Sequence, residues 1–400
     1  MRISGFTHNQ SAFDQSFGYD NLDRLSGWSG FNTTQGFGYD LTGNRTSLSI
    51  GGSGYAYTVQ STSNRVTQTA GPGGVKSFGF DVAGNTTSAG SLIFAYDARG
   101  RIVSATTALG PVTYQLNALS QRVAKTVSGM TTRYHYDANG NLIGETTGTS
   151  YRDYAWLGSL PVAILEGTSQ YYVHADHLDT PRVVTNASNT IVWRWDSDPF
   201  GFFPAAEDPD GNSQLFTLNL RFPGQYFDKE TNLHYNYFRD YDPQTGRYVE
   251  SDPIGLEGGI NTYAYVGSNS LSQIDPAGLQ VAVPAAPPVP LAPGFINFNA
   301  NIAQGLTDVI NRIVDACTGC PPCDPPVGTS CFVGPHNHPN NYPQLRGSTV
   351  HYHMFVRQQI PAPSCQCLWR RDTKTYGKGA AVLAPPFGVA PCPLEVGTRE

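Results

Sequence analysis

Two short turn motifs that begin with aspartate have the residue types and spacing to do chemistry in this sequence. Asp-Pro-x-Gly-Leu occurs at residues 252–256 and again at residues 275–279. Proline restricts the aspartate before it to extended backbone, and the glycine permits a tight reversal of the chain. Each carboxylate is therefore predicted at a rigid strand-to-turn corner, and Arg239, about one hairpin earlier, can reach the same place.

Two adjacent carboxylates beside a guanidinium are a set of groups that can hydrolyse a peptide bond. One ionised carboxylate deprotonates the attacking water, and the other, protonated, donates to the developing oxyanion. Two carboxylates held close together do not both ionise cheaply, and a guanidinium holds one of them charged. The residues alone leave a simpler interpretation open, in which each aspartate caps its own turn. They also do not assign the general acid and the general base.

The segments that must position these side chains repeat with a period of about 20 residues. Alternating aromatic and small residues followed by Asp-x-x-Gly predict a strand and a turn that tolerates positive φ. One such hairpin cannot bury its own face, so stacked units forming a mainly β array are expected. The clearest units are FGYDNLDRL (17–25), FGYDLTGNR (37–45), FGFDVAGNT (78–86), FAYDARGRI (94–102) and YHYDANGNL (134–142).

The composition agrees with this prediction. Charged residues make up only 14% of the 400 residues, whereas the chain has 43 glycines and 22 tyrosines. Such a composition is typical of short strands and tight turns and not of an acidic disordered chain. No apolar run reaches the roughly 18 residues of a membrane-spanning helix, and the N-terminus shows no secretory signal.

The repeat units resemble the tyrosine-aspartate repeats of Rhs and YD-repeat proteins. The next segment resembles the Rhs repeat-associated core, through YYVHADHLDTPRVVTN (171–186), VWRWDSDPFG (192–201) and the long motif over 220–279. One departure is Asp179, where family members usually have glycine. The resemblance implies a YD-repeat β-hairpin strip over 1–150 and the core over 151–279, as part of a shell that spirals around a C-terminal toxin.

The resemblance also implies self-cleavage. In this family the core cuts its own chain after the leucine of the last Asp-Pro-x-Gly-Leu motif. Carried over by motif position, the catalytic residues are Arg239, Asp252 and Asp275, and the cut falls between Leu279 and Gln280. No cofactor is expected for the core. Because the repeats are too few to enclose the tail alone, we expect this chain to be the C-terminal part of a longer protein, or a short orphan module.

The composition changes after Leu279, where the tail (residues 280–400) begins. The residues before it are net acidic, whereas the tail is slightly basic, a weak indication of a nucleic-acid target. The proline-rich residues 280–298 predict an extended linker. Apolar residues at spacings of three and four predict an amphipathic helix over 299–316. We therefore expect a variable, cysteine-rich α+β effector domain over 299–400.

The tail also contains all seven cysteines and two His-x-His pairs, whose use the sequence leaves open. A small exported domain gains stability from disulfides. Cysteine and histidine also bind structural zinc, and the histidine pairs could form a catalytic metal site. The candidate residues are Cys317, Cys320, Cys323, Cys331, Cys365, Cys367, His336, His338, His351 and His353.

Two functional hypotheses follow. The first is the C-terminal section of a secreted polymorphic toxin, whose shell encloses and autoproteolytically releases an effector used in interbacterial competition or host interaction. The resemblance implies the chain's own tail as cargo, a cognate immunity protein and secretion-system components as partners. The alternative is a cell-surface or wall-associated YD-repeat protein with a disulfide-stapled adhesion tail.

Overall fold

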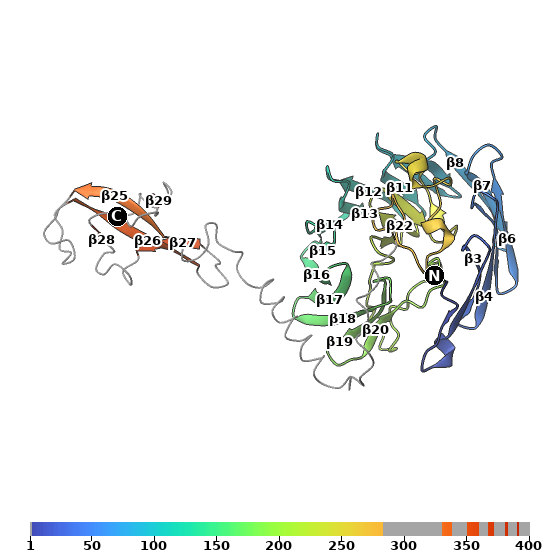
Figure 1. Ribbon diagram of the computed structural model, residues 1–400, viewed down its shortest axis with the longest axis horizontal. Helices are drawn as coiled ribbons and strands as arrows, with labels where there is room; N and C mark the ends of the chain where they lie inside the picture. Colours follow the sequence, from blue (N-terminus) through green and yellow to red (C-terminus); the bar gives the residue numbers. More distant parts are fainter. Residues whose placement is uncertain are drawn as a thin grey trace. The chain divides into compact units, whose positions relative to one another are not determined.

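A computed structural model describes residues 2–282 of the protein and, beyond them, only the backbones of five strands. The chain divides into two compact units, Met1–Leu291 and Ala292–Glu400, and Figure 1 draws both. The predicted helix over 299–316 lies outside the described residues. So do Cys317, Cys320, Cys323, Cys365 and His338.

The first unit is built on one antiparallel sheet of 20 strands, called the strip below, in which every strand pairs with its neighbours along the chain. A short 3-10 helix, η1 (Ser11–Phe13), follows the first strand. The strands are β1 (Gly5–Phe6), β2 (Gln15–Tyr19), β3 (Leu25–Gly30), β4 (Thr33–Tyr39), β5 (Arg45–Ile50), β6 (Ser53–Val59), β7 (Val66–Gly71), β8 (Gly74–Phe80), β9 (Thr86–Ala89), β10 (Leu92–Tyr96), β11 (Ile102–Thr107), β12 (Gly110–Leu116), β13 (Arg122–Val127), β14 (Met130–Tyr136), β15 (Leu142–Thr147), β16 (Ser150–Leu157), β17 (Leu160–Glu166), β18 (Ser169–Ala175), β19 (Pro181–Asn186) and β20 (Ile191–Arg194). The sheet passes residue 150 without interruption, because β15 and β16 pair there.

The repeated aspartate is explained by the turn that it caps. The Asp137 carboxylate accepts hydrogen bonds from the backbone amides of Asn139, at 2.9 Å, and Asn141, at 2.8 Å. Its second oxygen accepts from the Asn141 side chain at 3.0 Å. The same self-capping recurs at Asp40 and Asp97. Since these bonds satisfy turn amides that no strand partner reaches, the motif fixes where each hairpin reverses.

Asp179, which replaces the usual glycine, does not change its turn. Its φ of 62° is in the left-handed region that glycine prefers, and aspartate tolerates that region better than most residues. The Asp176 amide still donates to the Thr180 carbonyl at 2.9 Å, as in the other turns. The departure from the family pattern therefore leaves the conformation of this turn unchanged.

A β-bulge next to each capped turn explains why the strip curves. The register shifts by one residue just before the turn aspartate, for example between Gly38 and Tyr39 and between His135 and Tyr136. The same shift occurs near the ends of β2, β6, β8, β10, β12, β16 and β18. Bulges bend a strand and increase its twist, so repeating one at the same edge bends the whole sheet in one direction (Figure 1).

The closing segment (residues 195–282) lies within this curve (Figure 1). It contains a four-stranded antiparallel sheet and two 3-10 helices. These elements are β21 (Tyr226–Asp228), β22 (Leu233–Asn236), β23 (Arg239–Asp242), β24 (Arg247–Tyr248), η2 (Gly255–Gly258) and η3 (Val266–Ser268). The segment binds the turns of the strip: Tyr263 donates to the Gly84 carbonyl at 2.7 Å, and Tyr235 donates to the Ser120 carbonyl at 3.1 Å.

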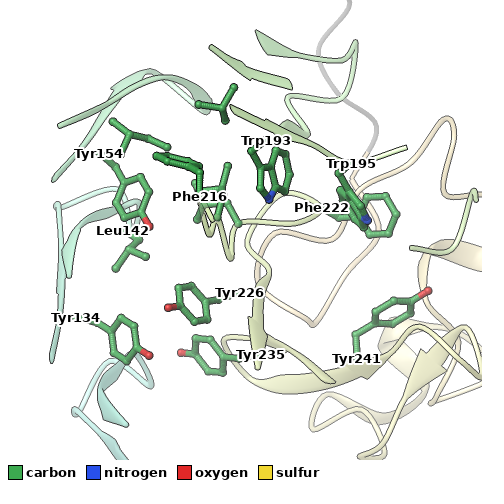
Figure 2. Packing of buried hydrophobic residues seen from close by; sticks show 14 of the residues in the cluster. Tyr134, Leu142, Tyr154, Trp193, Trp195, Phe216, Phe222, Tyr226, Tyr235 and Tyr241 are labelled. Carbon is green, nitrogen blue, oxygen red and sulfur yellow. The ribbon is translucent and has the colours of Figure 1, made fainter. Parts of the chain in front are cut away.

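Aromatic side chains fill the space between the strip and the closing segment (Figure 2). Tyr134 of β14 and Tyr226 of β21 meet edge to face, with ring centroids 5.2 Å apart. Trp193, in the last strand of the strip, and Trp195, at the start of the closing segment, are among the most deeply buried side chains in the described residues. Large aromatic side chains contribute most to such a core, because each one removes a large apolar area from water.

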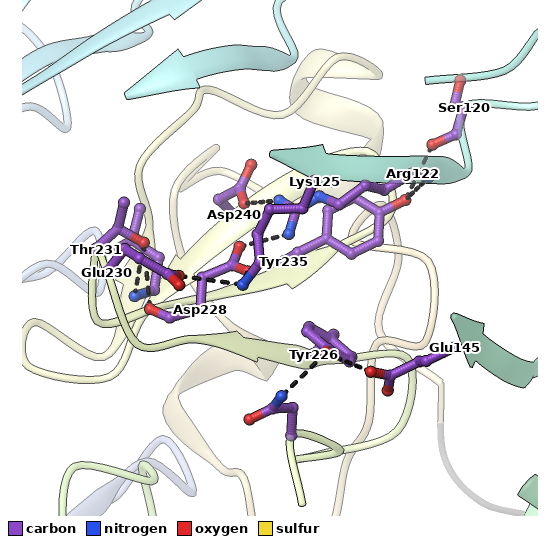
Figure 3. Close-up of polar contacts among 12 residues, drawn as sticks. Ser120, Arg122, Lys125, Glu145, Tyr226, Asp228, Glu230, Thr231, Tyr235 and Asp240 are labelled. Carbon is purple, nitrogen blue, oxygen red and sulfur yellow. Dashed lines mark hydrogen bonds and ion pairs between the residues drawn. The ribbon is translucent and has the colours of Figure 1, made fainter. Parts of the chain in front are cut away.

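A buried ionic cluster joins the two parts at a second place (Figure 3). Arg122 of β13, only 2% exposed, donates to the carboxylate of Asp228 on β21 and, at 3.3 Å, to Asp240 on β23. The rings of Tyr114 and Tyr235 lie on the guanidinium, each with its centroid 4.0 Å from Cζ. The cluster therefore crosslinks the strip to two strands of the inner sheet.

Lys125 adds a second cation to the same cluster, because its Nζ lies 3.0 Å from Asp228 and 3.1 Å from Glu230. Burial alone raises the pKa of Asp228, but the charges of Arg122 and Lys125 outweigh burial and hold this pKa below its usual value. Asp228 is therefore ionised wherever the protein is folded near neutral pH.

The second unit contributes five short strands to the described residues. These are β25 (Ser330–Asn337), β26 (Val350–Gln359), β27 (Cys367–Arg371), β28 (Ala381–Val382) and β29 (Ala390–Pro391). They form a sheet in the order β27, β26, β25, β29, and β28 also pairs with β26. The mainly β class is thus confirmed for the described chain. None of its helices has the length or apolar character that crossing a bilayer requires.

Removing the shared carboxylate of the buried cluster is expected to be strongly destabilising. Asp228→Ala leaves Arg122 and Lys125 buried with too little negative charge, a defect that costs about 3–5 kcal/mol. We expect a lower urea midpoint, measured by tryptophan fluorescence. Asp23→Ala is the control, because Asp23 pairs with Arg2 on the surface and should change stability by at most about 1 kcal/mol. Equal effects of the two variants would contradict this role for the cluster.

Candidate functional site

Arg239 is the centre of the candidate site. It begins β23, where it lies opposite Asn236 of β22, and its side chain is 3% exposed. One guanidinium nitrogen, Nη2, lies 2.9 Å from Asp252 Oδ2 and 3.3 Å from Asp275 Oδ2. The structure therefore brings together the three residues that the sequence predicts as catalytic.

The remaining donors of the guanidinium hold it in one orientation. Its Nε donates to the carbonyl of Gly278, and its Nη1 donates to the carbonyl of Thr262 at 3.1 Å. The ring of Tyr248 lies under the guanidinium, with its centroid 3.7 Å from Cζ. The planar group thus binds both acids and the backbone just before Leu279 in a single arrangement.

The two Asp-Pro-x-Gly-Leu turns differ in what their carboxylates bind. Asp252 Oδ1 accepts from the Ile254 amide at 3.0 Å, a local capping contact. Asp275 Oδ1 instead reaches further along the chain, to the amides of Leu279 at 2.9 Å and Gln280 at 3.2 Å. The nitrogen of Gln280 belongs to the peptide bond that the sequence predicts to be cut. The second carboxylate is therefore in direct contact with that bond.

Two glycines allow the chain to approach this closely. A Cβ on Gly258 would lie 2.4 Å from Asp252 Oδ2 and 3.1 Å from the Leu279 carbonyl oxygen. Asp252 Oδ2 and the Leu279 carbonyl oxygen therefore both border the space at Gly258 that the missing side chain leaves. Gly278 has a φ of 70°, and a Cβ there would lie 2.4 Å from the Asn236 carbonyl oxygen. Neither position accommodates a side chain without displacing the site.

The candidate bond lies where the chain passes from the interior to the surface. Asp275 is 2% exposed, whereas Leu279 is half-buried and Gln280 is exposed. Just beyond, Ala282 pairs with Ile274 through backbone hydrogen bonds of 2.7 and 2.9 Å. The peptide is thus held on both sides, and solvent can reach it from the Gln280 side.

Burial and neighbouring charges act on the proton affinity of Asp252. Burial is the largest influence on Asp252 and raises the pKa of its carboxyl. Arg239 and the Ile254 amide oppose this increase, and the charge of Asp275 adds to it. Behind the site, burial raises the pKa of Asp240 to about 7, against the opposing charge of Arg122.

Sequence reasoning did not identify Tyr248, Asn236 or Gly258 as part of this site. The available signal is only proximity along the chain, since Tyr248 is on the strand that leads into Asp252. A tyrosine in an aromatic-rich β segment has the pattern of an ordinary core residue. Only the packing shows that its hydroxyl contacts Asp275, at 2.8 Å.

The tail candidates have described positions only in the strands. His336 lies opposite His351 in the pairing of β25 with β26, and His353 lies opposite Val333. Cys331 is on β25, and Cys367 is the first residue of β27. Disulfide or zinc use of these residues stays a prediction. Where side chains are described, no group of three or more His, Cys, Asp or Glu residues is arranged to hold a metal ion.

Fold and site together define a repeat-built β-shell segment with a buried Arg–Asp–Asp cluster at its C-terminal end. The chain belongs to the teneurin YD-shell family, whose family model matches residues 3–258. This finding confirms the membership in the Rhs and YD-repeat proteins that the sequence motifs predict.

Two of the similar proteins are much longer than this chain. Double-stranded DNA deaminase toxin A of Burkholderia cenocepacia (strain H111) is 38% identical over 109 residues, which cover 27% of this chain and 8% of that protein. The tRNA3(Ser)-specific nuclease WapA of Bacillus spizizenii is 28% identical over 253 residues, or 60% of this chain and 11% of WapA. The chain thus spans about a tenth of these two relatives.

A solved structure supports the fold. The crystal structure of TcdB2-TccC3 without its hypervariable C-terminal region superposes with a TM-score of 0.55 and 19% identity. The match covers 69% of this chain and 16% of that one. At this identity the likeness shows that the shell fold is shared.

Removing the guanidinium should destabilise the protein in a pH-dependent way. Arg239→Met leaves two buried carboxylates without a cation, which costs about 3–5 kcal/mol at neutral pH. The pKa of Asp252, already raised, rises further, so the penalty applies above this pKa and disappears as the pH falls through it. We expect the difference in urea midpoint between variant and wild type to be smaller at about pH 4.5 than at pH 7.

The matched control is Arg99→Met, which removes an exposed arginine from a turn of the strip. This variant should differ little from wild type at either pH. If Arg239→Met lowers the urea midpoint by the same amount at both pH values, the assigned electrostatics would be contradicted.

Proposed function

We propose that this chain is the C-terminal section of a toxin that cleaves itself between Leu279 and Gln280 and so frees its tail. The observation that carries the proposal is the contact of Asp275 Oδ1 with the Gln280 amide. Asp252 Oδ2 borders Gly258 together with the Leu279 carbonyl oxygen of the same peptide. Two acids at one peptide bond are the groups that carboxylate-catalysed hydrolysis requires.

The proposed chemistry is addition of water to the Leu279 carbonyl carbon with two carboxylates sharing one proton. Arg239 makes this state accessible, because its charge allows one of the two close acids to remain ionised. The buried site favours strong electrostatic interactions, and the bound peptide is already adjacent to both acids. Each chain needs only a single turnover.

The relatives support an effector role for the released tail. Two of them are named as a DNA deaminase toxin and a tRNA nuclease, and the solved shell is named as lacking a hypervariable C-terminal region. By analogy, the tail acts inside a competing or host cell after export. We propose secretion or surface display, secretion-system components as partners and a cognate immunity protein that protects the producing cell.

Expression of the whole chain should yield two products. The 43.2 kDa chain is expected to separate into residues 1–279 and 280–400, identified by intact mass. Asp275→Asn and Asp252→Asn should each slow cleavage by about a hundredfold or more, because neither amide can exchange the proton. The control Asp97→Asn changes a capped turn far along the strip and should cleave normally. A folded wild-type chain that stays intact would refute self-cleavage.

The effector role has a separate test. Inducing the whole chain in bacteria should arrest growth, and the Asp275→Asn variant at equal abundance should arrest it much less, since the tail remains attached. Normal growth in cells that accumulate the cleaved tail would refute a toxic effector with a target in those cells. That outcome would favour an adhesion role.

A further inference from the structure

The hydroxyl of Tyr248 is a buried polar group in the site that the proposed hydrolysis does not yet use. Tyr248 is 1% exposed and is the last residue of β24. Its Oη donates to Asp275 Oδ2 at 2.8 Å, and its ring supports the Arg239 guanidinium. The side chain therefore contacts one of the two acids and the cation, but does not contact Asp252 through any hydrogen bond among the described residues.

Asn236 fixes the direction in which this hydroxyl donates. Its Nδ2 lies 2.9 Å from the Asp275 carbonyl oxygen, which can only accept, so the amide nitrogen must face it. The same Nδ2 donates to Tyr248 Oη at 2.8 Å. Because Oη already accepts this hydrogen bond, its single proton is directed toward Asp275. The chain of donors runs from Asn236 through Tyr248 to the carboxylate.

The two acids consequently have unequal surroundings. Asp275 accepts hydrogen bonds from the Tyr248 hydroxyl, from Arg239 and from the amides of Leu279 and Gln280. Every one of these groups is a donor, and a carboxylate that accepts several donors is favoured in its ionised form. A proton on Asp275 would displace at least one of them.

Asp252 has fewer donors around it. It accepts from the Ile254 amide and pairs with Arg239 through Oδ2. That same Oδ2 borders the space at Gly258, which the Leu279 carbonyl oxygen also borders. A proton on Asp252 Oδ2 would therefore have an acceptor nearby, whereas a proton on Asp275 would face donors.

We infer that Tyr248 is a positioning residue that keeps Asp275 ionised as the general base and leaves the shared proton on Asp252 as the general acid. The inference rests on the proposed self-cleavage and adds to it the roles of the two acids. Tyr248 touches neither the Leu279 carbonyl nor the Gln280 nitrogen through any hydrogen bond in the described chain, so it acts through Asp275.

With these roles, the proposed hydrolysis accounts for every proton. A water molecule from solvent attacks the Leu279 carbonyl carbon, its proton passes to Asp275, and Asp252 protonates the carbonyl oxygen. The tetrahedral diol then collapses: the hydroxyl proton returns to Asp252, and the proton on Asp275 passes to the Gln280 nitrogen as the C–N bond breaks. Asp275 Oδ1 already lies 3.2 Å from that nitrogen. The products are a carboxylic acid on Leu279 and an amine on Gln280.

Tyr248 is suited to a fixed donor role. Burial, with the charge of Asp275 adding to it, raises its pKa well above the usual value, so the hydroxyl keeps its proton wherever the protein is folded. The other charged or titratable groups that act on Asp275 are Arg239 on β23, Asp252 in the following turn and Tyr265 before η3. None of the three is altered by removing the Tyr248 hydroxyl.

The test compares two tyrosine-to-phenylalanine variants. Tyr248→Phe removes only the hydroxyl and keeps the ring under Arg239. The control, Tyr241→Phe, removes a buried hydroxyl in the same aromatic cluster that donates to the Phe200 carbonyl. Each whole chain is labelled in a short pulse of cell-free translation and moved to buffers from about pH 4 to pH 8, and cleavage is followed on gels.

Tyr248→Phe should cleave about tenfold more slowly, and the acid limb of its rate profile should move up by about one pH unit, because the ionised base has lost a donor. Tyr241→Phe should keep the wild-type profile. An unchanged rate, or a slower rate with an unmoved acid limb, would overturn the role of Tyr248 while leaving self-cleavage intact. Failure of the wild-type chain to cleave would instead reject the proposed function.

A second variant tests the same proposal in case Tyr248→Phe folds poorly. Tryptophan fluorescence would reveal such a folding defect. Asn236→Leu has a similar volume and removes the donor that directs the tyrosine hydroxyl. We expect a smaller decrease in rate and a shift of the acid limb in the same direction. A wild-type profile in this variant would exclude the donor chain from Asn236 to Asp275.

Discussion

The arrangement of the C-terminal end of this shell segment depends on one buried guanidinium. Arg239 binds both carboxylates and the Gly278 carbonyl, and thereby joins a strand, two turns and the candidate peptide bond. Without this positive charge, burying both acids in their ionised forms near neutral pH would be strongly unfavourable. The same contact that stabilises the fold therefore also holds the two acids beside the candidate peptide bond.

That guanidinium is held in place by the way the strip is built. Each hairpin ends in a turn that an aspartate caps, and a bulge beside the turn bends the sheet in the same direction. The accumulated curvature surrounds the closing segment, which binds the turns through side chains such as Tyr263. A regular local motif, repeated, thus produces an enclosed space in which a buried polar site is stable.

The duplicated Asp-Pro-x-Gly-Leu motif shows how identical residues acquire different roles. In the first copy the carboxylate caps its own turn at Ile254, and in the second it reaches the Gln280 amide. Burial of a tyrosine hydroxyl beside the second copy increases the difference. The two carboxylates are chemically equal in the sequence, and their neighbours in space make them unequal.

The sequence by itself determined the repeat and the class of fold, and its resemblance to a known family pointed to Arg239, Asp252 and Asp275. The repeat and the fold class could be predicted for a physical reason. Those features depend on local chemistry, since aspartate caps a turn and alternating aromatics form a strand wherever they occur. Tyr248, Asn236, Gly258 and the Arg122–Asp228 cluster could not be predicted, because their contacts join residues remote in sequence. Only the tertiary structure decided which atoms face the Leu279–Gln280 peptide, because proton affinity depends on the neighbours that folding brings together.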